Sequence, residues 1–347
     1  MSIDVEQSIK GFVKAIGRNE ILPFIGIYQN LVSSYFKYKK LIKTYNPDFL
    51  LVTGNLTVIP NSMAERTIVY VHFPTPKDLK LPKIQRDYTS NIWNKLYVQL
   101  YLFISNNIDY NDDDIDLGYI KKATIITNSN YTRNAIKKVW NIDSTVIYPP
   151  CPQYSFPLED KIKKIEKDTT TVCSLGRFVP EKKYDTIIQI AKERPHLKFE
   201  LIGGVAEDKI SYLNNLKNKA PKNVTFHVNA TENQKMEILK RSKILLHSFK
   251  GEHFGIALIE AMSAGLIPVS HNSGAAKEDN IVDERFRYSD LGSALDCLDK
   301  AVSEWNLDKA SRLREYAQSF SMENYNKNLK LFITNWIKSN THLFKNK

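Results

Sequence analysis

Two glutamates, Glu252 and Glu260, lie eight positions apart in the segment EHFGIALIEAMSAG (252–265). On one helix this spacing would separate them by about 12 Å along the axis. The carboxylate pairs of glycosidases lie about 5–9.5 Å apart, so the spacing disfavours a hydrolytic pair. We expect the helix to begin at Gly255, with Glu252 in the preceding loop and Glu260 a turn and a half inside the helix.

The start of this helix is a candidate phosphate site. The backbone N–H groups of Phe254, Gly255 and Ile256 would lack partners inside the helix and would lie at the positive end of its dipole. The two glutamates on either side can accept hydrogen bonds from sugar hydroxyls. A ligand with a sugar, a diphosphate and a ribose in a row matches this order, although two glutamates at this spacing also occur by chance.

A second segment, LGRFVPEKK (175–183), follows an expected strand and opens an expected helix. Arginine offers phosphate oxygens a planar fork, and lysine offers a compact charge. Arg177 and Lys182 would stabilise a departing diphosphate by about 3–4 kcal/mol per donor in a closed site. Alone they read as surface residues, but with the glutamate segment in the same domain they favour phosphate binding.

From residue 171 onward, short buried strands alternate with helical patterns. The strand candidates are TVCSLG, LKFELIGG, VTFHV, KILLHSF and LIPVSH, and the helix candidates are YDTIIQIAKE, SYLNNLKNK, ENQKMEILKRS and FGIALIEAMSA. This alternation predicts an α/β fold with a parallel sheet covered by helices on both faces. Ligands of such sheets bind at the carboxyl ends of the strands.

The first part of the chain shows a similar, shorter pattern. Strands are expected at DFLLVTG, TIVYVHFP and ATIITNSN, and helices near 25–45, 91–107 and 131–140. Four prolines in VIYPPCPQYSFP (146–157) interrupt regular structure and mark a boundary. We therefore expect an acceptor-binding domain over 1–149, a donor-binding domain over 150–320 and a C-terminal helix over 321–347 that packs back toward the first domain. A cleft between such domains commonly binds small ligands.

Composition favours a globular cytoplasmic enzyme. The 347 residues are 42% hydrophobic and 25% charged, and no apolar run reaches the ~18 residues of a spanning helix. The N-terminus lacks the pattern of a secretion signal. Three scattered cysteines predict neither a disulfide framework nor a zinc site.

The net charge of +11 would favour binding to nucleic acid, to an anionic membrane or to phosphorylated substrates. The sequence contains no basic block interleaved with glycine or aromatic residues, the pattern that would indicate nucleic-acid binding. Two segments combine lysine with apolar residues: LVSSYFKYKKLIK (31–43) and the tail that carries Lys327, Lys330, Lys338, Lys345 and Lys347. Each is either a solvated helix face or a surface that docks on anionic headgroups.

Several of these motifs together resemble a known family. GRFVPEKKYDTII, ELIGG and EHFGIALIEAMSAGLIPVSHNSG are similar to the donor-binding half of glycosyltransferase family 4, whose GT-B fold sets two Rossmann-like domains across a cleft. YVHFPT (70–75), TNSNYT (127–132) and IYPPCP (147–152) further resemble segments of the GDP-mannose α-1,2-mannosyltransferases that extend dolichol-linked oligosaccharide. The resemblance covers about residues 30–340.

The resemblance implies roles for particular residues. Arg177 and Lys182 would neutralise the nucleotide diphosphate, Glu260 would bind the ribose, and Glu252 would bind the transferred sugar. The backbone of His253, Phe254, Gly255 and Ile256 would lie beside the phosphates, and His72 would face acceptor and sugar across the cleft. The family transfers hexoses with retention and normally needs no metal or other cofactor.

One departure from the family concerns the start of the chain. Before residue 60 there are only the isolated Gly11, Gly17, Gly26 and Gly54, and no Gly-rich loop. Either the start is trimmed or the acceptor domain is rebuilt, which predicts a shortened N-terminal domain.

The function expected is transfer of mannose from GDP-mannose to a glycan or lipid-linked saccharide, on the cytosolic membrane face or free in the cytoplasm. The alternatives are a UDP-glucose or UDP-GlcNAc transferase of the same family and a nucleotide-sugar-binding protein without turnover.

Three other features are given structural interpretations. NDDDID (111–116) is read as a solvated turn rather than a cation site, and IWNKLYVQLYLFI (92–104) as a buried helix. Four histidines without an evident carboxylate partner, His196, His227, His247 and His342, are read as structural.

Overall fold

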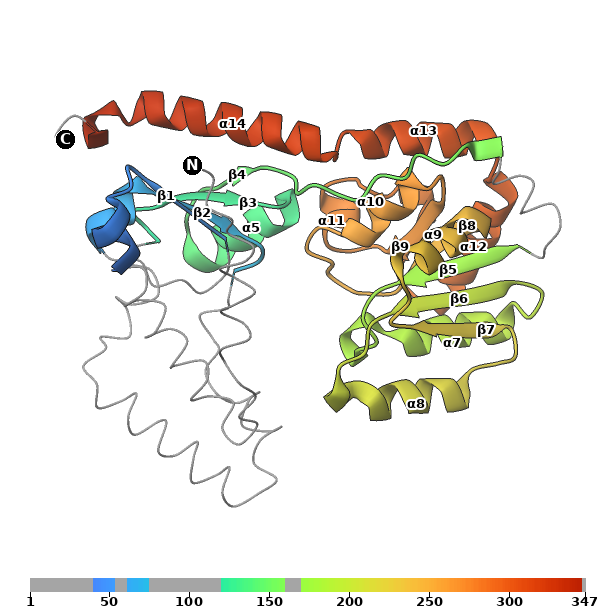
Figure 1. The fold of residues 1–347 in the computed structure, drawn as a ribbon. Helices are drawn as coiled ribbons and strands as arrows, with labels where there is room; N and C mark the ends of the chain where they lie inside the picture. Colours follow the sequence, from blue (N-terminus) through green and yellow to red (C-terminus); the bar gives the residue numbers. More distant parts are fainter. Residues whose placement is uncertain (1–39, 54–60, 75–119, 160–169, 345–347) are drawn as a thin grey trace, which may run out of the picture.

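The computed structural model describes residues 40–53, 61–74, 120–159 and 170–344. They form two α/β domains, each built on a parallel sheet (Figure 1). The expected helices near 25–45 and 91–107 fall outside the described residues, except that residues 40–45 are helical. The acidic run 111–116 also lies outside them.

The N-terminal sheet contains β1 (Leu50–Thr53), β2 (Thr67–Val71), β3 (Thr124–Thr127) and β4 (Thr145–Val146), in that spatial order. All its pairs are parallel. Every residue of β2 is buried, which requires cover on both faces because successive side chains alternate between them. One cover is α5 (Asn130–Trp140), whose Ile136 packs with Val69 of β2.

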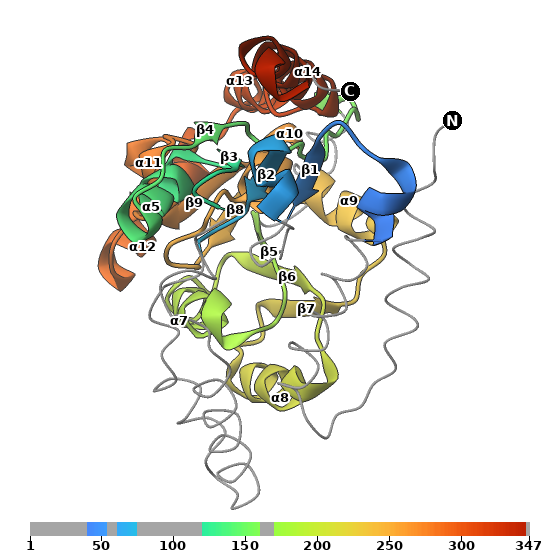
Figure 2. The same cartoon turned by 90° about the vertical axis from the view of Figure 1, so that its left-hand side faces the viewer.

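The other face of this sheet is covered by α14 (Met322–Ser339), the last α-helix described. Trp336 of α14 packs with Ile68 and Tyr70 of β2. Its indole Nε1 donates a 2.7 Å hydrogen bond to Oγ1 of Thr124, in β3. The C-terminal helix thus lies against the N-terminal domain. α13 (Leu307–Gln318) and α14 together run across both domains (Figure 1), and Figure 2 shows the two helices end-on above the strands.

The C-terminal sheet has six parallel strands in the order β10-β9-β8-β5-β6-β7. The strands are β5 (Thr171–Leu175), β6 (Lys198–Gly203), β7 (Val224–Val228), β8 (Ser242–His247), β9 (Ile267–His271) and β10 (Arg287–Tyr288). This confirms the predicted α/β class with a parallel sheet.

Helices connect these strands. They are α7 (Tyr184–Glu193), α8 (Ile210–Lys219), α9 (Glu232–Arg241), α10 (Ile256–Ser263), α11 (Ala275–Glu278) and α12 (Leu291–Glu304), followed by α13. The first four match the helical patterns in the sequence. Local signals explain several starts: Thr231 and Gln234 form a reciprocal capping box at α9, and Asp290 and Ser293 form one at α12.

The proline-rich linker runs without regular structure from Ile147 to Pro157. Prolines have no N–H to donate, so other linker groups attach it to the end of α13. The N–H of Cys151 donates to the carbonyl of Phe320 at 2.8 Å, and Nε2 of Gln153 donates to the carbonyl of Ala317 at 3.0 Å. The linker therefore lies beside the C-terminal end of α13, where the chain passes from one domain to the other (Figure 1).

None of the described helices is both long and apolar enough to cross a lipid bilayer.

Candidate functional site

The candidate residues of the C-terminal domain gather where the strands end. β5 leads into Gly176 and Arg177, β6 ends at Gly203, and β8 ends at His247. Because these strands are parallel, their carboxyl ends share one edge of the sheet, where ligands of such folds bind.

A cavity of about 650 Å³ opens at this edge. Three charged side chains line it: Arg177, Lys235 and Glu260. Its floor includes backbone from two strand ends that approach closely. A side chain at Gly203 would come within 1.9 Å of the carbonyl oxygen of Gly176, so only glycine fits there. The cavity therefore combines exposed backbone with two cations and one carboxylate.

Glu260 is held firmly inside α10. It is 7% exposed, and its Oε1 accepts hydrogen bonds from the hydroxyl of Tyr154 at 2.8 Å and from Nζ of Lys235 at 2.7 Å. Lys235 also pairs with Glu232 at 2.8 Å. Burial lowers the pKa of Lys235, but its bonds to Glu232 and Glu260 outweigh this and raise the pKa above its ordinary value. Within the described part of the chain, Tyr154 and Lys235 both bind Oε1 of Glu260, so Oε2 can accept a hydrogen bond from a ligand hydroxyl.

Glu252 lies in the loop between β8 and α10 and is paired with two basic groups. Its Oε2 is 2.8 Å from Nζ of Lys182 and 3.0 Å from Nε2 of His247. Burial disfavours the charged form of Glu252. The hydrogen bond and charge of His247 and the charge of Lys182 outweigh burial and lower the pKa of Glu252 to about 2. Glu252 is therefore an ionised, oriented acceptor at neutral pH.

Backbone contacts fix the loop that carries Glu252. The carbonyl of Glu252 accepts a 2.9 Å hydrogen bond from the N–H of Ala275, and the N–H of Gly251 donates to Oγ of Ser273 at 2.9 Å. Gly274 lies so close that a Cβ there would come within 2.4 Å of the Glu252 carbonyl oxygen, at a φ of +65°. The segment 273–275 therefore fixes the backbone conformation of this loop.

The helix α10 begins where the spacing predicted, with Gly255 as its N-cap. Phe254 is 3% exposed and packs its ring against Tyr148 and Phe320, each at a centroid distance of 5.7 Å. Its side chain therefore anchors the loop, and only its backbone is available to a phosphate. Ile256 and Gly176 line the cavity. Glu252 Cγ lies near Gly255, the residue before Ile256, and Lys182 Cδ lies near Gly176. The Lys182–Glu252 pair is therefore next to residues that line the cavity, without lining it itself.

His72 and His253 lie at the meeting of the two domains. His72 follows β2 and is exposed. His253 is partly buried, and its ring stacks on that of Phe73 with centroids 3.8 Å apart. Burial lowers the pKa of His253, the charge of Glu252 opposes this, and the charges of Lys182 and His72 lower it further. His72 thus precedes the residue whose ring stacks on His253.

Residues 155–320 match the model of the family described as glycosyl transferases group 1. Residues 155–320 are thus similar to members of that family. A curated protein of Xenopus laevis, the GDP-Man:Man(3)GlcNAc(2)-PP-Dol alpha-1,2-mannosyltransferase, is 31% identical over 238 residues, which cover 61% of this chain and 48% of that protein. The Dictyostelium discoideum protein of the same name is 25% identical over 87% of this chain and 66% of its own length. The chain thus spans about half of the first relative.

The two-domain architecture is that of GT-B glycosyltransferases. The crystal structure of a glycosyltransferase from Rickettsia africae superposes with a TM-score of 0.61 at 16% identity, over 96% of this chain and 85% of that one. The predicted fold class is therefore confirmed, and the C-terminal domain supplies the strand edge on which the candidate residues lie.

Sequence reasoning missed three residues of the candidate site. Lys235 and Tyr154 contact Glu260, and His247 contacts Glu252. The prediction that His227 and His247 lack carboxylate partners was wrong. His227 pairs with Glu200, and His247 pairs with Glu252. The available signal for His247 was its place at the end of a buried strand, five residues before Glu252. For His227, β6 and β7 run in register with Ile202 beside it, so Glu200 is its diagonal neighbour.

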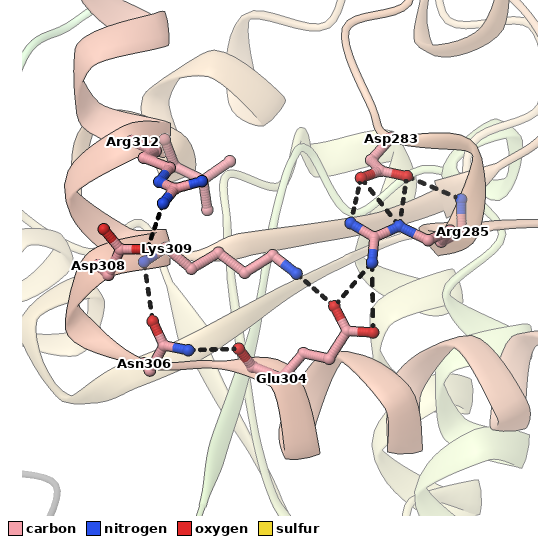
Figure 3. A pocket seen from close by; sticks show the side chains of 8 residues that line it. Asp283, Arg285, Glu304, Asn306, Asp308, Lys309 and Arg312 are labelled. Carbon is pink, nitrogen blue, oxygen red and sulfur yellow. Dashed lines mark hydrogen bonds and ion pairs between the residues drawn. The ribbon is translucent and has the colours of Figure 1, made fainter.

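A second cavity, of about 490 Å³, lies among charged residues at the ends of α12 and α13 (Figure 3). Arg285 pairs with Asp283 and Glu304, and Lys309 also pairs with Glu304. The turn containing Arg285 precedes β10, and α12 returns from the far end of that strand. This cavity is therefore at the amino edge of the sheet, and its charges neutralise one another.

Among the residues that the structure describes, no group of three or more His, Cys, Asp or Glu side chains is arranged to hold a metal ion.

Proposed function

We propose that this chain is a retaining hexosyltransferase that moves mannose from GDP-mannose to a hydroxyl of a glycan or lipid-linked saccharide. The observation that carries the proposal is the cavity at the carboxyl edge, with Arg177, Lys235 and Glu260 inside it and the Lys182–Glu252 pair at its border. The choice of mannose and GDP is supported by the names of the relatives, two of which match 61% and 87% of this chain.

The proposed donor extends through the cavity in three parts. Its diphosphate lies at the start of α10, where N–H groups have no partner inside the helix, and Arg177 and Lys182 lie beside it. Oε2 of Glu260 accepts hydrogen bonds from the ribose hydroxyls. Glu252 accepts hydrogen bonds from the mannose hydroxyls, on the side of the diphosphate nearer to the N-terminal domain.

In the proposed reaction, the bond between C1 of mannose and the phosphate oxygen breaks, and a bond from C1 to the acceptor oxygen forms. The acceptor proton passes to an oxygen of the departing GDP, and no enzyme nucleophile is assigned. Charge develops on the diphosphate as the bond breaks, so fixed cations lower the barrier, each by about 3–4 kcal/mol. His72 faces the acceptor in this arrangement, and no metal or other cofactor takes part.

We also propose that the protein acts on the cytosolic face of a membrane, docked through the outward face of α14. Lys327, Lys330, Leu331 and Lys338 are exposed on this helix, while its opposite face packs on the N-terminal sheet. Basic residues close to an anionic bilayer contribute about 1 kcal/mol each. Such docking would bring a lipid-linked acceptor to the cleft.

The decisive experiment measures GDP and UDP binding by calorimetry and hexose transfer from GDP-mannose, UDP-glucose and UDP-GlcNAc to lipid-linked saccharide acceptors. We expect GDP to bind more tightly and only GDP-mannose to support transfer. Arg177→Ala and Glu252→Ala should each reduce kcat at least a hundredfold while the protein remains folded, since each removes a transition-state contact. Preferential use of a UDP-sugar would assign the alternative donor. Tight nucleotide binding without transfer to any acceptor would replace the enzyme with a binding protein.

A further inference from the structure

The N-terminal domain holds the residue next to Glu252 at two points. The ring of His253 lies nearly parallel to that of Phe73, with an interplanar angle of 4° and centroids 3.8 Å apart. Tyr131 completes the group, since its ring is 5.8 Å from Phe73 and 6.5 Å from His253. We call Phe73, Tyr131 and His253 the aromatic stack. The carbonyl of His253 also accepts a short hydrogen bond from Oγ of Ser129.

Both N-terminal contacts start from rigid groups. Ser129 is the N-cap of α5, and its hydroxyl is fully buried and bonded to the N–H of Thr132. Phe73 follows His72, whose carbonyl accepts hydrogen bonds from Nδ2 of Asn128 at 2.9 Å and from Oγ1 of Thr132 at 3.3 Å. The surface that meets His253 is therefore preformed in the N-terminal domain.

A separate contact joins the two domains beside the stack. Oδ1 of Asp279 accepts the N–H of Asn130 at 2.6 Å, and Oδ2 accepts the N–H of Tyr131 at 3.1 Å. The hydroxyl of Tyr148 donates to Oδ1 of Asp279 at 3.0 Å. This carboxylate at the start of α5 satisfies helix N–H groups and lies at the favourable end of the dipole. Docking of the domains therefore does not depend on the stack alone.

The loop around Glu252 is thus held from two directions. Its own domain fixes the carbonyl of Glu252 through Ala275, and the N-terminal domain fixes the following residue, His253, by ring and carbonyl. We propose that the aromatic stack is a positioning device, through which docking of the N-terminal domain sets the placement of Glu252 for sugar transfer. Phe73 is then a positioning residue that acts through His253, and this inference rests on the proposed function.

The stack should affect turnover and leave nucleotide binding nearly unchanged. Arg177, Lys235 and Glu260 line a cavity that neither Phe73 nor Tyr131 borders. Displacement of a reacting group by about 1 Å costs on the order of a hundredfold in rate. We therefore expect Phe73→Leu to lower kcat about ten- to hundredfold, with the dissociation constant for GDP within about twofold of wild type.

The test compares Phe73→Leu with Phe73→Tyr, which keeps a flat ring and should restore kcat, and with Phe49→Leu as a matched control. Phe49 packs its ring on Trp336 at 5.7 Å, in the same domain but in the cluster beneath α14, so its loss should leave kcat unchanged. His253→Leu should lower kcat as Phe73→Leu does. The double variant should be no slower than either single one, because both remove the same contact.

Amide hydrogen exchange of residues 251–255 supplies a readout that needs no substrate. Loss of one aromatic pair should speed exchange there up to about tenfold in Phe73→Leu and not in Phe49→Leu. Unchanged exchange, unchanged kcat, or a loss of GDP affinity equal to the loss of kcat would each overturn the inference. A wild-type chain that transfers no sugar would overturn the proposed function instead, and exchange would then decide whether the stack holds the loop.

Discussion

Replacing Glu252 by glutamine gives a direct test of the electrostatics of the site. Glutamine has the shape of glutamate but cannot ionise. In the folded protein the pKa of Glu252 is lowered from 4.5 to about 2. At 1.36 kcal/mol per pKa unit, the ionised carboxylate contributes about 3 kcal/mol to the free energy of unfolding at pH 7.

The sign of the pH dependence follows from the direction of the shift. Because the pKa is lower in the folded state, the contribution is complete above the unfolded value near 4.5 and is lost as the pH falls toward 2. At pH 3 a little under half of it, on the order of 1 kcal/mol, should remain. The wild type should therefore exceed Glu252→Gln in stability by about 3 kcal/mol at pH 7, and the difference should narrow steadily below pH 4.5.

The measurement is urea unfolding followed by circular dichroism at several pH values between 7 and 3. Glu315→Gln is the matched control, since Glu315 lies on the exposed side of α13 and its replacement should change the free energy of unfolding only slightly. A stability difference for Glu252→Gln that stays constant from pH 7 to pH 3 would refute the reasoning. It would mean that Lys182 and His247 do not hold this carboxylate in its charged form.

Two other perturbations test the proposed donor site and the proposed membrane-docking face of α14. Lys235→Met removes the cation that fixes Oε1 of Glu260, and a charged hydrogen bond contributes about 1.5–3 kcal/mol, so calorimetry should show the dissociation constant for GDP raised at least tenfold. Lys240→Met is its control, because Lys240 pairs with Glu237 on the same helix and does not line the cavity; equal effects of the two variants would exclude Lys235 from the site. In flotation with vesicles containing anionic lipid, the wild type should associate in a salt-sensitive manner, and replacing Lys327, Lys330 and Lys338 by glutamine should weaken association about fivefold per lysine. Association that is independent of both salt and these lysines would remove α14 as the docking surface.

Local sequence patterns determined most of the C-terminal domain. The segment YDTIIQIAKE forms a helix over the same ten residues, because its apolar positions recur with the helical period and leave one face to bury. The strands from TVCSLG to LIPVSH are short apolar runs that only a doubly covered parallel sheet can bury. The spacing of Glu252, Gly255 and Glu260 similarly predicted the helix start. The position of a glycine N-cap depends on residues close to it in the sequence, so the sequence alone can indicate it.

The partners of the charged groups were decided by the tertiary structure alone. His247 meets Glu252 because the loop between them folds back over the end of β8, and Lys235 reaches Glu260 from a different helix. The spacing of residues in the sequence does not predict these side-chain contacts, because they depend on which helices and strands the order of the sheet brings together. The contact between Phe73 and His253 is the clearest case. These residues lie far apart in the chain and in different domains, and only the docking of the two domains makes their rings neighbours.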